Sequence, residues 1–481
     1  MTPRWLRAAR LARYGRDTVM SRRAALLAGA GALGAGLLSA APVRAAGRGR
    51  VVIVGAGFAG LACGYELQAA GFDVVIVEGR NRVGGRVFSR ADIALGGGVV
   101  EFGAELIGAN HPHWVAYAQK FGLQFRDVSD EDNLDWPVIL DHRLLKPATA
   151  GAALEGLKLG EAALTQAAAA IDPKAPWQAA NAAKLDAQTL HSFLAQVDMP
   201  RLSRRVFEEI ESANNAVEAR RQSLLATLAS IQAHGGESYW TDSEVYRCIG
   251  GNQGLALKFA AALGADRIRL ETPAAAIAQR PGGGAQVTLK SGERLEGDVA
   301  VLAIPPSLWA TLTLDVALPE VQIGWAMKHF TPLARRPWRP LGRSQYAMAD
   351  VMPVETWDGL DGQPGADAMM VGFSGGDVAR LGAALSPVER NARHAAMYEL
   401  AWPGFTALAG RPVTANWPAD PFTRAGYSFP APGQLTRVKD ALLAGFGHLR
   451  IAGEHASIGF PGYMEGALDS GVATAKAIAA G

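Results

Sequence analysis

The chain has 481 residues, enough for two or three domains with large hydrophobic cores. Its content of 49% hydrophobic and 19% charged residues is typical of globular proteins and excludes a disordered chain. The formal net charge of +2 is misleading, because residues 1–45 hold eight arginines and one acid; removing them from the 47 basic and 45 acidic residues leaves 39 and 44, a net charge of −5. This charge gives no electrostatic reason to bind nucleic acid.

The first 45 residues are predicted to be an export signal. Ser21-Arg22-Arg23 precedes an apolar run rich in Gly and Ala from Ala24 to Ala41, and Val43-Arg44-Ala45 fits a small-residue cleavage site. The paired arginines resemble the twin-arginine signal, although Ala25 stands where that signal usually has Phe. We therefore expect the twin-arginine machinery to export the folded protein to the periplasm or the medium, with no membrane span after cleavage. A retained anchor is the alternative, and Met20 is an alternative start.

A dinucleotide-binding pattern follows the signal. The apolar run Val51–Val54 predicts a strand, Gly55-x-Gly57-x-x-Gly60 leads into a helical pattern, and a second strand, Val74–Val77, ends in Glu78. The first two glycines allow a tight turn close to a pyrophosphate, the third lets the helix pack on the strand, and the acid accepts from a ribose hydroxyl. The pattern predicts a Rossmann-type domain.

The rest of the chain alternates between sheet and helix patterns. A strand is expected over Val99–Gly103, and residues 150–245 read as helices separated by Pro173, Pro176 and Pro200. Next come a helix over 255–263, short strands at 268–270, 285–289 and 299–303, and Pro305-Pro306, which ends this sheet.

Two stretches resemble the flavin-containing amine oxidase superfamily, which includes monoamine oxidases, polyamine oxidases and L-amino-acid oxidases. One is the Arg80-Asn81-Arg82-Val83-Gly84-Gly85-Arg86 segment directly after the acid; the other is Ala452-Gly453-Glu454 with Gly462-Tyr463-Met464-Glu465-Gly466-Ala467. The glycines and guanidinium of the first would reach the pyrophosphate a second time, as an extended flavin dinucleotide allows. The resemblance spans nearly all of the mature chain.

The resemblance implies an α/β fold in which a Rossmann-type FAD domain, built from three segments, is interleaved with an α+β substrate domain that carries a helical insertion. The expected FAD-domain segments are residues 46–110, 246–306 and 416–481. The substrate domain is expected to comprise residues 111–245, which are mainly helical, and 307–415.

The same resemblance places noncovalent FAD contacts along the chain. They are expected at Gly55, Gly57, Phe58, Ala59, Gly60, Glu78, Gly79, Arg80, Gly84, Gly85, Arg86, Gly103, Ala104, Glu105, Ala274, Trp417, Gly453, Glu454, Tyr463 and Met464. Trp417 is expected to pack on the flavin ring, Glu454 to accept from a ribityl hydroxyl, and the Met464 N–H to meet the pyrimidine end. Gly426 stands where animal monoamine oxidases have the cysteine that binds flavin covalently, which is why we expect no covalent bond.

Three residues are predicted to be catalytic. Flavin oxidation of an amine requires a substrate held in orientation over the cofactor, a task that rigid aromatic rings perform well. Tyr427 and Tyr463 match the family's aromatic cage, with ordinary core tyrosines as the alternative. Lys328 matches the lysine that holds a water against flavin N5, where a buried ammonium would stabilise charge during oxygen reduction; a solvated surface lysine is the alternative.

Other residues bear on the substrate. Leu106 stands where many L-amino-acid oxidases have an arginine that pairs with the substrate carboxylate, which favours amines without one. Glu105 is interpreted as attracting a distal ammonium, as in polyamines, or as capping a loop. His111-Pro112-His113-Trp114 favours a helix start over a metal pair, and no metal is expected.

The sequence thus predicts an FAD-dependent oxidase. It would convert a primary or secondary amine to an imine and then an aldehyde, releasing ammonia or an amine, while O2 becomes hydrogen peroxide. Three alternatives stay open: an L-amino-acid oxidase that uses another arginine, an amine dehydrogenase with a periplasmic electron acceptor, and a flavin-binding assembly partner without turnover.

Overall fold

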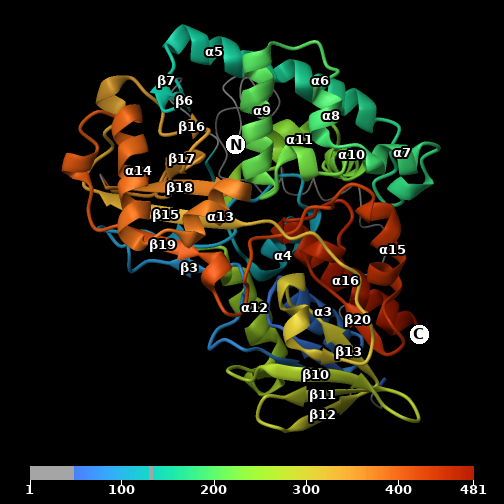
Figure 1. Ribbon diagram of the computed structural model, residues 1–481. Helices are drawn as coiled ribbons and strands as arrows, with labels where there is room; N and C mark the ends of the chain where they lie inside the picture. Colours follow the sequence, from blue (N-terminus) through green and yellow to red (C-terminus); the bar gives the residue numbers. More distant parts are fainter. Residues whose placement is uncertain (1–47, 129–133, 366) are drawn as a thin grey trace.

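The computed structural model describes residues 48–128, 134–365 and 367–481 (Figure 1). Three main sheets of five, four and seven strands are combined with helices, which confirms the predicted α/β class. The expected export signal at residues 1–45, with Arg22 and Arg23, lies outside the described residues. Within the described ranges, no helix is both long enough and apolar enough to cross a membrane.

A parallel five-stranded sheet, in the order β20-β13-β1-β2-β9, forms the centre of the first domain. Its strands are β1 (Arg50–Val54), β2 (Asp73–Val77), β9 (Ile268–Arg269), β13 (Val299–Leu302) and β20 (Leu449–Ile451). The sheet therefore joins parts of the chain that lie hundreds of residues apart. The four apolar residues Val51–Val54 are all buried, because both faces of the sheet are covered.

The two faces of this sheet carry different layers. Val51 and Ile53 face the helices, which are α3 (Phe58–Ala69), α4 (Pro112–Phe121), α12 (Gln253–Leu263) and α16 (Met464–Ala480). Val52 and Val54 face the other side, where the four-stranded sheet lies with α15 (Gln434–Ala444). The strands of that sheet are β10 (Ala274–Gln279), β11 (Ala285–Leu289), β12 (Arg294–Gly297) and β14 (Thr313–Leu314), and the first three lie at the bottom of Figure 1.

The seven-stranded sheet forms the second domain, in the order β19-β15-β18-β17-β16-β6-β7. Its strands are β6 (Val138–Leu140), β7 (Arg143–Leu144), β15 (Ala326–Leu333), β16 (Met348–Ala349), β17 (Glu355–Asp358), β18 (Ala368–Gly375) and β19 (Val413–Asn416). Every residue of β15 and β18 is buried. The helices α13 (Gly376–Ala384) and α14 (Pro387–Ala401) pack against this sheet (Figure 1).

Short helices between residues 147 and 242 form a layer at the top of Figure 1. They are α5 (Pro147–Glu155), α6 (Leu157–Ala168), α7 (Ala182–Ala187), α8 (Leu190–Leu194), α9 (Arg201–Asn214), α10 (Leu224–Ala233) and α11 (Ser238–Asp242). Pro200 immediately precedes α9. Two short antiparallel pairs form separate sheets: β3 (Ser89–Arg90) with β4 (Val100–Glu101), and β5 (Phe125–Asp127) with β8 (Tyr246–Cys248). The strand expected over Val99–Gly103 is thus only two residues long.

Glycine lets α3 pack closely against its neighbours. A Cβ added to Gly60 would lie 2.0 Å from the carbonyl oxygen of Gly55, and one added to Gly471 of α16 would lie 2.4 Å from the carbonyl oxygen of Ala59. Real Cβ atoms do not approach backbone oxygens so closely. The third glycine of the motif is therefore required by packing between helix and strand, as the sequence predicts.

We expect Gly60→Ala to destabilise the protein by about 2–3 kcal/mol, because the new methyl group overlaps backbone that cannot move away cheaply. The matched control is Gly151→Ala, in the exposed part of α5, where an added Cβ meets nothing within 4 Å. It should raise stability by up to about 1 kcal/mol, since alanine favours helix. Thermal unfolding followed by circular dichroism compares the two variants, and equal midpoints would contradict the close packing.

Candidate active site

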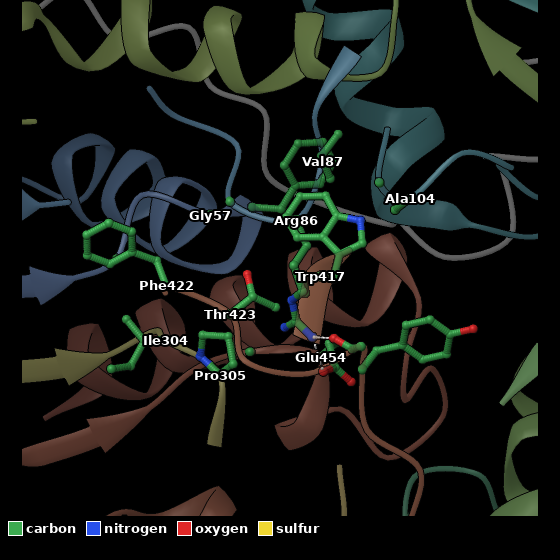
Figure 2. A pocket seen from close by; sticks show the side chains of 18 of the residues that line it. Gly57, Arg86, Val87, Ala104, Ile304, Pro305, Trp417, Phe422, Thr423 and Glu454 are labelled. Carbon is green, nitrogen blue, oxygen red and sulfur yellow. Dashed lines mark hydrogen bonds and ion pairs between the residues drawn. The ribbon is translucent and has the colours of Figure 1, made fainter. Parts of the chain in front are cut away.

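A cavity of about 320 Å³ lies where the two domains meet. It is lined by the glycine-rich turn after β1, the ends of β2 and β13, the β15 and β17 strands, the segment 417–427 and the start of α16. Figure 2 shows Arg86 joined to Glu454 with Trp417 beside them, and Phe422, Ile304 and Pro305 farther to the left. The cavity therefore draws its walls from both domains and from segments far apart in the sequence.

Nearly every residue that the sequence predicts to contact FAD lines this cavity. They are Gly55, Gly57, Phe58, Ala59, Glu78, Gly79, Arg80, Gly84, Gly85, Arg86, Gly103, Ala104, Glu105, Ala274, Trp417, Gly453, Glu454, Tyr463 and Met464. Gly60 is the exception, because it faces the backbone of the strand turn and not the cavity.

One end of the cavity is a cradle of backbone. Gly55 has a φ of +111°, which favours glycine, and a Cβ added to Gly57 would meet nothing within 4 Å, so this backbone is open to a close ligand. The Glu78 carboxylate accepts from the Ala56 N–H at 2.8 Å and from the Arg80 N–H at 2.9 Å, which fixes the turn.

Two helices begin at the cavity, α3 at Phe58 and α16 at Met464. The first N–H groups of a helix have no acceptor inside the helix, and the helix dipole makes this end attractive to anions. His455 also lines the cavity with both ring nitrogens buried and without a hydrogen-bond partner among the described residues. An open glycine cradle, two helix N-termini and an unpartnered imidazole together fit a dinucleotide with a pyrophosphate and many polar edges.

Arg86 and Glu454 link the cradle to the C-terminal segment. Arg86 Nη1 donates to Glu454 Oε1 and to the Gly426 carbonyl oxygen, both at 2.9 Å. Glu454 Oε2 accepts from Ser428 Oγ at 2.5 Å and from the Gly462 N–H at 2.8 Å. Although burial opposes ionisation, Arg86 and these donors hold the pKa of Glu454 below its ordinary value. Glu454, which the sequence analysis expects to accept from a ribityl hydroxyl, already accepts from these protein donors. Its contacts fix the position of Arg86.

Lys328 lies on β15 and lines the cavity, but its ammonium is fully used by the protein. Its Nζ donates to Glu105 Oε2 at 2.6 Å, to the Gly103 carbonyl oxygen at 2.8 Å and to the Glu101 carbonyl oxygen at 3.2 Å. An ammonium has three protons, and all three have protein acceptors. In this geometry no ammonium proton of Lys328 is left over for the water that the sequence interpretation assigns to it, and its charge is buried as that interpretation expects.

Glu105 is the centre of this ionic network. Besides Lys328 it binds Arg247 of β8, whose Nη2 lies 2.8 Å from Oε1, and it accepts from Trp357 Nε1 at 2.9 Å. Burial opposes ionisation, yet Lys328 and Arg247 hold the pKa of Glu105 below its ordinary value. Neither interpretation from sequence, a distal-ammonium acceptor or a loop cap, fits a carboxylate with three side-chain partners. The sequence missed Arg247 and Trp357, because nothing near them marks them as part of the site.

The two predicted cage tyrosines lie at the other end of the cavity. Tyr427 donates from its hydroxyl to the Asn214 carbonyl oxygen at 2.8 Å, and its ring packs beside Gly462, the residue before Tyr463. Tyr463 is in contact with the rings of His111 and His234. Burial, followed by neighbouring tyrosine and glutamate side chains, raises the pKa of Tyr463 well above its ordinary value. Both rings are half-buried at the cavity, as expected for side chains that contact a substrate.

Three further sequence interpretations concern this region. Trp417 lines the cavity and donates from Nε1 to the Phe102 carbonyl oxygen at 3.0 Å, which fixes its ring. His111 Nδ1 accepts from the Gly108 N–H just before α4, and His113 pairs with Glu465 at 2.8 Å, so the two histidines do not converge. Gly426 packs tightly, because an added Cβ would lie 2.7 Å from the backbone nitrogen of Ala326.

Comparison with known proteins agrees with this site. The family model for flavin containing amine oxidoreductases matches residues 58–479. The Probable flavin-containing monoamine oxidase A of Dictyostelium discoideum is 25% identical over 448 residues, covering 89% of this chain and 97% of that protein. Two solved structures each cover 90% of this chain and 99% of their own with a TM-score of 0.77: a putrescine oxidase bound to putrescine, 22% identical, and a cyclohexylamine oxidase of Brevibacterium oxydans, 23% identical.

The chain therefore belongs to the flavin containing amine oxidoreductase family. It is an amine-oxidising oxidoreductase with a flavin cofactor, which confirms the family predicted from sequence.

Proposed function

We propose that this enzyme oxidises primary or secondary amines that carry no carboxylate, using noncovalent FAD and O2. When bound, the flavin would supply two-electron oxidation of the amine and the reduction of O2 to hydrogen peroxide. The imine then takes up water to form an aldehyde and releases ammonia or an amine. The observation that carries the proposal is one cavity with a dinucleotide cradle at one end and two half-buried tyrosines at the other.

The protein's own groups have distinct tasks in this proposal. The glycine cradle and the N-terminal end of α3 hold the pyrophosphate, and Glu78 fixes the turn that approaches it. The start of α16, directly after Tyr463, meets the pyrimidine end of the flavin. Tyr427 and Tyr463 hold the amine between their rings and exclude water from it. Arg86 and Glu454 keep the segments that carry these tyrosines in place.

The charges at the tyrosine end favour an amine over an amino acid. Leu106 lines the cavity, and the nearby Arg247 is engaged with Glu105. Glu244 and Glu355 line the same end, and both raise the pKa of Tyr427, although burial is the larger cause. A substrate carboxylate would lie close to these acids, whereas an ammonium would be attracted.

We expect the concentration that gives half the maximal rate of anaerobic flavin reduction to be at least about tenfold lower for each amine than for its parent L-amino acid. The reason is that repulsion between the amino acid's carboxylate and the nearby glutamates costs on the order of 1–4 kcal/mol. Stopped-flow absorbance of the flavin band with phenethylamine and L-phenylalanine makes the comparison. Faster reduction by the amino acid would favour an L-amino-acid oxidase. A flavin that no amine or amino acid reduces would favour a binding protein without turnover.

The flavin is expected to be released by acid. Gly426 stands at the position of the covalent cysteine and has no room for a side chain, and the two cysteines, Cys63 and Cys248, are buried outside the cavity. Acid precipitation should therefore leave the yellow colour in the supernatant. Colour retained in the pellet after washing would contradict noncovalent binding.

Lys328 is proposed to act through charge during reoxidation. Lys328, Glu105 and Arg247 carry a combined charge of about +1 in a buried network. Lys328→Met removes this charge and should slow reoxidation by O2 roughly ten- to a hundredfold, since preorganised charge stabilises an anionic transition state. Glu105→Gln raises the combined charge and should not slow it. Stopped-flow measurement of both half-reactions decides: equal slowing of amine oxidation by Lys328→Met would assign the lysine a structural role.

A further inference from the structure

A second cavity of about 70 Å³ adjoins the first at Tyr463. Asn214, Glu244, Glu355 and Tyr463 line both cavities, so they form the boundary between them. The remaining wall includes five aromatic side chains, which are Trp136, Phe207, Tyr239, Trp240 and Tyr346. A substrate held at Tyr463 therefore has a further space next to it, which the proposed oxidation of one amine group does not use.

Four glutamates from different elements line this second cavity. Glu161 lies on α6, Glu211 on α9, Glu244 between α11 and β8, and Glu355 on β17. Glu161, Glu211 and Glu355 are 6%, 7% and 4% exposed, respectively. Among the residues that the structure describes, no Lys, Arg or His lines the cavity. We name these four residues and their cavity the glutamate chamber.

Glu355 carries a hydrogen-bond acceptor in the chamber that no described protein group satisfies. Its Oε2 atom is buried and has no hydrogen-bond partner within the described part of the chain. Glu211 Oε2 accepts from Asn215 Nδ2 at 3.2 Å. Native proteins satisfy buried acceptors almost without exception, because an unmet carboxylate oxygen loses its hydration. The unmet acceptor of Glu355 therefore points to a donor from a ligand.

The ionisation of the chamber is poised near neutral pH. Burial, then Glu244 and Glu211, raises the pKa of Glu355 to about 7, and burial with Glu244 raises that of Glu211 to about 7. Burial, together with the charge of Glu211, raises the pKa of Glu161 to about 8. Lys158, which pairs with Glu155, lowers the pKa of Glu161 but does not offset these two causes. Several of these carboxyls therefore hold protons when no cation is near, and an entering cation would displace them.

We propose that the glutamate chamber binds a second cationic group of the substrate, so that the preferred substrates are diamines or polyamines. One amine lies between Tyr427 and Tyr463 and reacts, while the distal ammonium donates to Glu355 and its neighbours. Charge-assisted hydrogen bonds to carboxylates are the strong contacts available to an ammonium. This inference rests on the proposed amine oxidation and adds the class of amine. It moves the distal-ammonium role that the sequence suggested for Glu105 to a different set of carboxylates.

The first test compares 1,4-diaminobutane with butylamine in anaerobic flavin reduction. In the unmodified enzyme the diamine should half-saturate the rate at a concentration at least about tenfold lower. Glu355→Gln and, separately, Glu211→Gln should reduce this ratio severalfold, since an amide cannot neutralise an ammonium. The matched control is Glu320→Gln, at an exposed position away from both cavities, which should keep the ratio. Equal half-saturation by the two amines, or an unchanged ratio in both chamber variants, would overturn the inference.

The second test measures proton release and does not depend on turnover. Calorimetric titration of the reduced holoenzyme under nitrogen, whose flavin can accept no further electrons, counts the protons released on binding at pH 7 in two buffers of different ionisation enthalpy. The diamine should release more protons than butylamine, and Glu355→Gln should lower the difference, because the reacting amine loses its proton in both cases. Equal release would overturn the chamber assignment. If no amine reduced the flavin while this difference was observed, the proposed function would fail and the chamber would stand as a cation site.

Discussion

The ion pair between Arg86 and Glu454 is the interaction on which the site depends. It joins residues 368 positions apart, and the same glutamate also holds Ser428 and Gly462, the neighbours of the two cage tyrosines. One buried carboxylate thereby sets the position of the glycine-rich segment relative to the aromatic end. Because the cost of taking two charges out of water offsets much of their attraction, this contact determines geometry more than it adds stability.

A second buried network connects the two domains. Lys328 of the seven-stranded sheet and Arg247 of β8 both bind Glu105, which lies in the first segment of the nucleotide domain. The network explains why Glu105 is unavailable to a substrate and why the lysine has no proton left for a water. The remaining carboxylates at the tyrosine end, Glu244 and Glu355, are then the charges that a substrate meets.

The sequence predicts those parts of the protein whose chemistry is local. The Gly55–Gly60 turn, Glu78 and the start of α16 follow from residue types at fixed spacing, and they lie where the motif requires. The strands β10 and β12 were not predicted, because Ala274–Gln279 is rich in alanine and Arg294–Gly297 has little apolar alternation. The partners of Lys328 and Glu105 could not be predicted either, since they depend on how distant segments pack. For the same reason no signal marked the glutamate chamber, whose four acids are spread over almost 200 residues.

The placement of α16 has a consequence for how the protein is made. Its N-terminal end lines the cofactor cavity, its Gly471 packs on α3, and β20 just before it covers the β13 edge of the parallel sheet. A nascent chain that lacks residues 449–480 therefore has an open sheet edge and an incomplete cavity, however long its N-terminal portion has had to fold. Cofactor capture must wait until residues 449–480 have been made and packed, so flavin cannot stabilise the N-terminal portion of the site on its own.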